Sequence, residues 1–255
     1  MIAVALAAAS LLAPASAGAS GGRSPLAIAA SPAHVRLAGT ATATLRVTNW
    51  GSARVVADVG AAGFVLGLRG RPRIVRRPAG QRVAASWLTI SPRRLVLPAG
   101  GSAVLRVSSA VPRRAEPGDH PALVLVTTRP RADARIGVRM EIGVVVVVRV
   151  PGAVVHRLAL GRLSLRRHGA RRLLELGIAN LGNVTEPVGP GRLRVELLQR
   201  GRVVGRARPA RRQLLPRSRG VEEIAYRGRV TGPVEVLVEL TQGGRTMRRV
   251  FHLRL

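Results

Sequence analysis

Apolar and polar residues alternate one by one through much of this chain, and this alternation constrains the fold more than any other feature. It is clearest in residues 44–48, 193–197 and 234–240. A period of two places successive side chains on opposite faces of a β-strand, with one face buried and the other in water. Gly, Pro and Asn interrupt the pattern roughly every 8–12 residues. Many short strands at this spacing are typical of an all-β sandwich or barrel.

Three segments of the first half recur in the same order in the second half. The matched pairs are 45–51 with 176–182, 95–102 with 214–218, and 117–126 with 232–238. The first pair is an alternating strand that runs into Asn-x-Gly, where Asn and Gly tolerate a tight turn. Pro151 marks the junction, because proline cannot donate a ladder hydrogen bond. The sequence therefore predicts two tandem immunoglobulin-like β-sandwiches, residues 25–150 and 151–255, each of ordinary domain size.

The N-terminal segment has the pattern of an export signal. Residues 2–12 are apolar except for Ser10, and Ala15-Ser16-Ala17 follows as an A-x-A-like cleavage site. We expect residues 1–17 to be a signal peptide and residues 18–24 a flexible spacer; the alternative is a buried strand or helix. The run of valines at 144–148 is too short to span a bilayer and indicates a buried strand. The protein is thus expected to be exported, extracellular or associated with the cell envelope.

Several enzyme chemistries are excluded by residue types that the chain does not contain. There is no Cys, and all 42 basic residues are Arg, so thiol, Schiff-base and Walker A chemistry lack their key residues. The five His residues show no metal-binding spacing. Asp119-His120 is expected to be a pair of turn residues, and Glu222-Glu223, the only acidic doublet, would split across the faces of a strand. We expect no catalytic residues, no metal and no cofactor.

Residues 87–101 carry a Trp, then a Pro, then the segment Leu95-Val96-Leu97-Pro98-Ala99-Gly100. This resembles the signature of exported immunoglobulin-like domains in two bacterial groups, the pilus-chaperone superfamily and the Gram-positive WxL-interacting surface proteins. Residues 111–122 are closer to the second group. The resemblance implies a two-domain, non-enzymatic, extracytoplasmic binding protein, whose first domain is associated with peptidoglycan and whose second binds a protein. The chain lacks the Lys with which pilus chaperones grip a subunit's terminal carboxylate, so that mechanism is not carried over.

The formal net charge of +30 has two interpretations: an anionic partner such as a wall polymer, or the codon bias of a GC-rich genome. Residues 18–150 contain 20 Arg and 5 acidic residues, and residues 151–255 contain 22 Arg and 7 acidic residues. The excess is therefore equal in the two halves, without a basic tail. The five aromatic residues do not interleave with the Arg clusters, so we expect no specific nucleic-acid partner.

A few residues stand out as candidates for partner binding. Trp50 lies in a predicted turn and could be exposed, whereas Trp87 is expected to anchor the core. Paired arginines suit bidentate contacts with phosphate or carboxylate groups. The candidate partner-binding residues are Trp50, Arg71, Arg73, Arg93 and Arg94.

The leading functional hypothesis is an envelope adaptor that binds a surface protein, peptidoglycan or an anionic wall polymer. A chaperone-like assembly factor for secreted or pilus-type subunits is one alternative, and a binder of anionic envelope polymers through charge alone is another. For the first two, a partner strand could add to an open sheet edge. The apolar region 136–150 is the first candidate for that edge; otherwise it is simply the last core strand of the first domain.

Overall fold

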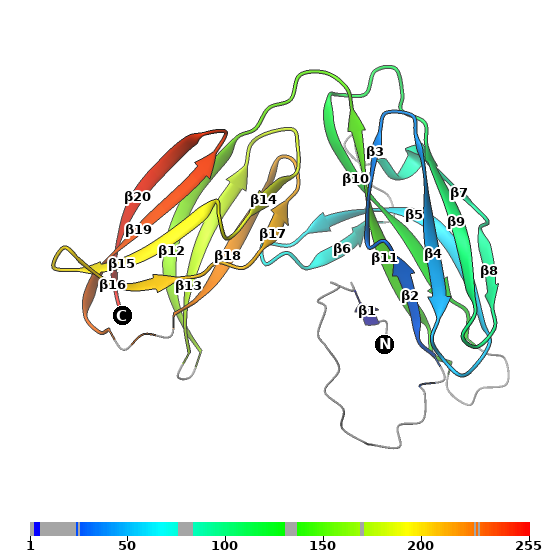
Figure 1. The fold of residues 1–255 in the computed structure, drawn as a ribbon, viewed down its shortest axis with the longest axis horizontal. Coiled ribbons are helices and arrows are strands. Elements are labelled where there is room, and N and C mark those ends of the chain that lie inside the picture. The colour runs from blue at the N-terminus through cyan, green and yellow to red at the C-terminus, as the bar shows by residue number, and fades with distance from the viewer. Residues whose placement is uncertain are drawn as a thin grey trace. The chain divides into compact units, whose positions relative to one another are not determined.

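The computed structural model describes residues 3–5, 24, 26–75, 84–130, 137–168, 171–226, 228 and 230–255 (Figure 1). In this part of the chain β-strands predominate, and the one helical element is the short 3₁₀ turn η1 (Ala84–Trp87). No helix among the described residues has the length and apolar character needed to cross a membrane. The prediction of an all-β fold is confirmed.

The chain divides into two compact units. Unit 1 consists of residues 1–64, 74–116 and 120–151, and unit 2 of residues 65–73, 117–119 and 152–255. Two short segments from the first half of the sequence therefore belong to unit 2. Continuous sequence alone would not assign them there.

Unit 1 is a sandwich of two sheets. Its strands are β1 (Ala3–Ala5), β2 (Ile28–Ser31), β3 (His34–Ala38), β4 (Thr42–Asn49), β5 (Val55–Leu66), β6 (Pro72–Val75), β7 (Leu88–Ser91), β8 (Arg94–Leu97), β9 (Ser102–Ser109), β10 (Gly118–Thr128) and β11 (Met140–Val150). One sheet has the order β2-β4-β9-β7. The other has the order β1-β11-β10-β5-β6, with β3 also paired to β11 and β8 to β5. This is the immunoglobulin arrangement, in which strands A, B, E and D form one sheet and G, F and C the other.

Unit 2 repeats the arrangement. Its strands are β12 (Leu158–His168), β13 (Arg171–Asn180), β14 (Glu186–Val188), β15 (Leu193–Gln199), β16 (Arg202–Ala207), β17 (Arg212–Leu214), β18 (Ser218–Tyr226), β19 (Pro233–Gln242) and β20 (Arg245–Arg254). They form the sheets β12-β13-β18 and β16-β15-β19-β20, with β14 and β17 as a separate pair. The expected tandem of immunoglobulin-like sandwiches is confirmed.

Each unit has its own core of Val, Leu, Ile and Ala side chains, as expected from an aromatic content of only 2%. In unit 1 the core includes Trp87, which is 8% exposed and whose ring lies 4.7 Å from the His120 ring. The expected role of Trp87 as a core residue is confirmed. The expectation for Asp119-His120 was wrong, because both residues are buried within β10 rather than placed in a turn.

The repeated Asn-x-Gly segments form the same buried cap in both units. In unit 1, Asn49 Nδ2 donates to the carbonyl oxygens of Ala53 (2.8 Å), Leu97 (3.3 Å) and Pro98 (2.9 Å), and Asn49 Oδ1 accepts from the Gly51 N–H (3.0 Å). The side chain is fully buried. It joins the end of β4 to the segment that leads into β9.

In unit 2, Asn180 Nδ2 donates to the carbonyl oxygens of Val184 (2.7 Å), Leu214 (3.1 Å) and Leu215 (3.0 Å), and Asn180 Oδ1 accepts from the Gly182 N–H (3.0 Å). The partners come from the segments that the sequence comparison matched. The third match also holds, because β10 and β19 take the same place in their sheets. The internal repeat is thus confirmed down to individual hydrogen bonds.

Candidate functional site

The strongest candidate site in the described residues is the N-terminal half of β11 in unit 1. On the side away from β10, β11 pairs with β3 only from Val145 to Arg149. Beyond that, the three residues of β1 pair with Met140 to Ile142. Both neighbours run parallel to β11. The expected open edge in residues 136–150 is therefore corrected: β3 covers the C-terminal half, and β1 is the only described strand that borders the N-terminal half.

The backbone of this half is oriented for pairing with a further strand. The Val145 N–H donates to the Ala33 carbonyl oxygen (3.1 Å), and the Arg149 carbonyl oxygen accepts from Gly39 (2.8 Å), both on the β3 side. In a strand, the backbone groups of residues two apart point to the same side. The N–H and C=O groups of Glu141 and Gly143 therefore point toward the same edge as those of Val145.

An apolar surface lies on the outer face of the same sheet. Val144, Val146 and Val148 belong to the core, so Val145 and Val147 point to the opposite face. Leu123 of β10 and its register partner Ala62 of β5 lie on that face too. All four outer-face side chains are buried in this structure. β11 is therefore apolar on both faces, which is unusual for a strand at a sheet border.

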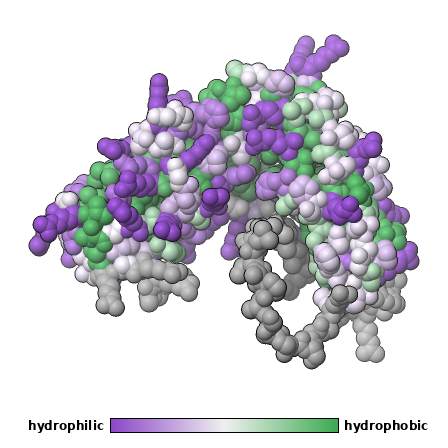
Figure 2. Space-filling view, in the orientation of Figure 1, coloured by the Kyte–Doolittle hydropathy of each residue, from purple (hydrophilic) through white to green (hydrophobic). Residues whose placement is uncertain are grey.

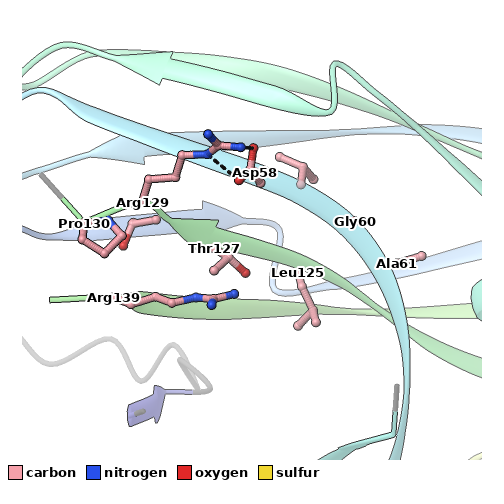
Figure 3. Close-up of a pocket in the computed structure, with 10 residues that line it drawn as sticks. Asp58, Gly60, Ala61, Leu125, Thr127, Arg129, Pro130 and Arg139 are labelled. Carbon is pink, nitrogen blue, oxygen red and sulfur yellow. Dashed lines mark hydrogen bonds and ion pairs between the residues drawn. The ribbon is translucent and has the colours of Figure 1, made fainter. Parts of the chain in front are cut away.

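A pocket of about 340 Å³ adjoins this surface (Figure 3). Its lining comes from β5, β10 and the residues beside them: Asp58, Val59, Gly60, Ala61, Leu125, Thr127, Thr128, Arg129, Pro130 and Arg139. Figure 3 shows the Arg139 side chain alongside Thr127 and Leu125.

Arg129, which lines this pocket, forms a bidentate pair with Asp58, with distances of 2.6 and 3.0 Å. The hydrogen bond from Arg129 lowers the pKa of Asp58, and Arg94 adds to the effect. Asp58 therefore stays ionised at neutral pH.

Glu141 was not identified by sequence reasoning. It lies on the outer face of β11, is 3% exposed, and its Oε1 atom has no hydrogen-bond partner among the described residues. A carboxylate at an outward position, three residues before a run of valines, was a usable signal. It was missed because the alternating pattern was interpreted for fold and not for isolated exceptions.

The five predicted partner-binding residues do not gather at one place. Trp50 is 64% exposed beside the Asn49 cap of unit 1. Arg93 and Arg94 are exposed at the start of β8, and Arg94 Nε lies 3.2 Å from Asp58 Oδ1. Arg71 and Arg73 are exposed in the segment 65–73, which belongs to unit 2. Their role in binding stays a prediction.

Many arginines of unit 2 are engaged by acidic side chains. Arg69 bridges Glu175 (2.8 Å) and Glu223 (2.6 Å). In the sheet β16-β15-β19-β20, three further short ion pairs are Arg194–Glu196 (2.6 Å), Arg206–Glu196 (2.8 Å) and Arg248–Glu239 (2.7 Å). Figure 2 shows hydrophilic side chains spread over the visible surface of both units instead of one stripe. Hydrophilic side chains thus do not outline a single binding patch on that face.

These contacts shift several pKa values. Hydrogen bonds from Arg206 and Arg194 lower the pKa of Glu196, and the hydrogen bond from Arg69 lowers that of Glu175. Burial raises the pKa of Glu222, which accepts a hydrogen bond from the Ala210 N–H. Glu222 and Glu223 split between a buried and a more exposed position on β18, as strand geometry predicts. No group of three or more acidic or His side chains within the described residues could hold a metal ion.

Comparison with known proteins finds similarity to solved structures of chaperones. No family model matches the sequence, and no curated protein matches it. The chain is similar to the solved YadV chaperone at 12% identity and a TM-score of 0.48, covering 89% of this chain and 99% of that one. It is also similar to the class 5 fimbriae chaperone CfaA (13%, 0.47, covering 88% and 98%) and to the structure of the Salmonella enterica SafA pilin with its SafB chaperone (13%, 0.45, covering 90% and 97%).

These likenesses concern the pilus-chaperone part of the expected resemblance. The WxL-interacting part has no support from them, and neither has a wall polymer as a partner. At 12–13% identity and TM-scores below 0.5, these likenesses do not assign a function to this chain.

Proposed function

We propose that this protein is a non-enzymatic, exported assembly factor that holds an extended segment of another exported protein by strand addition to β11. The observation that carries the proposal is the border of Met140–Val144, where β1 is the only neighbour opposite β10 among the described residues. β1 lies inside residues 1–17, the predicted signal peptide. Removal of that peptide would leave the N–H and C=O groups of Glu141 and Gly143 available to a partner strand.

The geometry defines how such a partner would bind. Both β1 and β3 run parallel to β11, so the added strand would run parallel too. Main-chain hydrogen bonds supply affinity in this mode, and pockets for alternate side chains supply specificity. The outer face beside the edge offers Val145, Val147 and Leu123 as apolar contacts. An extended segment with apolar residues at every second position fits this surface.

The short edge favours an assembly factor over the permanent adaptor that the sequence suggested first. A few residues of open edge bury less surface than the roughly 1,600 Å² typical of stable complexes. A client held there can be passed on to a final partner. An adaptor would instead keep its partner. The chaperone alternative is therefore the one we adopt, and the SafB chaperone, solved with a pilin, gives an example of such a client on this type of fold.

The test uses the exported full-length product, as processed by its host, and a ten-residue synthetic peptide that alternates Val and Thr. Gly143→Pro removes an edge N–H, and proline is tolerated at such edge positions. Gly143→Ala keeps the N–H, and its added Cβ would meet Leu123 and Leu125 only at 3.5 Å, an ordinary contact. We expect the Pro variant to bind the peptide at least ten-fold more weakly, and the Ala variant to bind within about two-fold of wild type.

Salt separates this proposal from binding through charge alone. The peptide is uncharged along its length, so its affinity should be unchanged in 0.5 M salt, where the Debye length is only about 4–5 Å. An interaction driven by the net charge of +30 would be lost under the same conditions. Equal binding by the Pro and Ala variants would overturn the strand-addition proposal.

A further inference from the structure

Glu141 is buried while β1 occupies the edge of β11, and one of its carboxylate oxygens has no hydrogen-bond partner among the described residues. The residue is 3% exposed, and that oxygen is Oε1. A carboxylate that is buried without compensation is unfavourable, which is why such groups are usually paired. Arg139 lies just before β11, and the contacts of the described residues include no ion pair between it and Glu141. The position calls for a donor that unit 1 does not supply from its described residues.

The register of β1 shows where a donor would come from. Ala3 pairs with Met140, Val4 with Glu141 and Ala5 with Ile142. Paired residues on neighbouring strands direct their side chains to the same face of the sheet. The position opposite Glu141 is thus one from which the side chain of an added strand lies on the same face as the carboxylate. A different strand in that place, with a cationic residue at the same register position, would pair with the carboxylate.

We infer that Glu141 selects the partner strand, and that the strand added to β11 carries a Lys or Arg side chain opposite Glu141 within an otherwise apolar face. This inference rests on the proposed strand addition and names the chemistry of the partner. On the C-terminal side, Gly143, Val145 and Val147 present an apolar path along β11. On the N-terminal side, Arg139 and the Asp58–Arg129 pair line the pocket of Figure 3. Glu141 is the acidic group between these two parts.

The net charge of the protein makes a preference for a cationic peptide easy to attribute to one site. With a net charge of +30, the protein repels cationic peptides in general. Any preference for a Lys-containing peptide must therefore arise at a local acidic group. The preference should also survive high salt, because a buried ion pair is screened far less than an exposed one.

The test extends the peptide experiment. Five peptides each place one Lys at a different position on the Val face of the alternating Val/Thr peptide, and the parent peptide has none. With the exported full-length protein, we expect one Lys position to bind at least ten-fold tighter than the parent in 0.5 M salt. Glu141→Gln, which keeps the shape of the side chain, and Glu141→Leu should both abolish this preference while still binding the parent. Glu235→Gln, at an exposed acidic position on β19 in unit 2, is the matched control and should retain the preference.

The possible outcomes distinguish a failure of strand addition from a failure of the role proposed for Glu141. If no peptide binds the wild-type protein, strand addition fails and the inference fails with it. If the parent binds but no Lys position is preferred, or if the preference persists in both Glu141 variants, the role of Glu141 is wrong while strand addition stands.

Discussion

β11 of unit 1 and β20 of unit 2 occupy the same place in their sandwiches, but their sequences are opposite in character. Each is the last strand of its unit and pairs with the strand before it in the chain, β10 or β19. β11 contains five consecutive valines and is buried on both faces. β20 contains four arginines and is exposed along most of its length.

The difference shows how one fold can carry a protected edge and, once β1 is removed as the proposed function requires, an available one. An edge strand that carries many charges resists pairing with other chains, because a partner would have to bury those charges. β20 therefore has the composition of a protected edge. β11 lacks such protection at Met140–Val144, where only Glu141 interrupts the apolar residues. The same topology thus leaves the choice between a closed and an open edge to side chains.

The largest expected effect is a charge placed in each of these strands. Val146 of β11 is fully buried in the core of unit 1, whereas Val250 of β20 is 49% exposed. Val146→Arg should destabilise unit 1 by more than about 4 kcal/mol or prevent its folding, since it buries an unpaired charge. Val250→Arg should change stability by less than about 0.5 kcal/mol. Thermal or denaturant unfolding measures both, and similar losses would contradict the contrast between the strands.

The next effect concerns the feature that the two units share. Asn49→Asp and Asn180→Asp keep the side-chain shape but remove the Nδ2 donor, which leaves three carbonyl oxygens facing a carboxylate. Each variant should lose about 3 kcal/mol or more, because buried acceptors stay unsatisfied. The two losses should agree within about 1 kcal/mol. Denaturant unfolding followed by Trp fluorescence for unit 1 and by circular dichroism for the whole chain would reveal a cap that matters in only one unit.

Acid is expected to lower the stability of the two units by different amounts. Among the described acidic residues, unit 2 has two whose pKa is lowered by Arg, Glu175 and Glu196, and unit 1 has Asp58. A lowered pKa in the folded state contributes stability above the unfolded pKa, which is 4.5 for Glu and 3.8 for Asp, and that stability is lost as pH falls through the folded pKa. Glu222 acts in the opposite direction, because its pKa is raised.

We therefore expect unit 2 to lose more stability than unit 1 between about pH 4.5 and pH 3. Glu196→Gln should flatten this loss in unit 2. Hydrogen exchange across this pH range, read separately for the strands of each unit, is the measurement. An unchanged profile in the variant would show that the Arg194 and Arg206 contacts add nothing to folding.

The smallest expected effect on stability is at the middle residue of each Asn-x-Gly segment. Trp50 is 64% exposed and Leu181 is 48% exposed, so Trp50→Ala and Leu181→Ala should each change stability by less than about 1 kcal/mol. If Trp50 contacts a partner, as the sequence suggested, Trp50→Ala should weaken peptide binding while Leu181→Ala does not. Equal binding by both variants would remove Trp50 from the site.

Much of the fold could be predicted from residue patterns alone. Alternation with a period of two identifies strands that bury one face, so residues 44–48 and 234–240 were correctly interpreted. The Asn-x-Gly repeats revealed two copies of one sandwich, because a buried Asn cap and its turn need these residue types at this spacing. The burial of Trp87 was expected separately, by analogy with the buried Trp of sandwich domains.

Which strands pair with each other was decided by the tertiary structure. Alternation shows which face of a strand is buried but not which strand lies beside it, so the coverage of β11 by β3 and β1 could not be predicted. Asp119 and His120 were misplaced because their polarity indicates a turn, while their actual burial depends on long-range contacts with Thr185 and Trp87, respectively. The isolation of Glu141 is likewise a property of the assembled sheet, since a carboxylate becomes costly only when its neighbours exclude water and provide no donor.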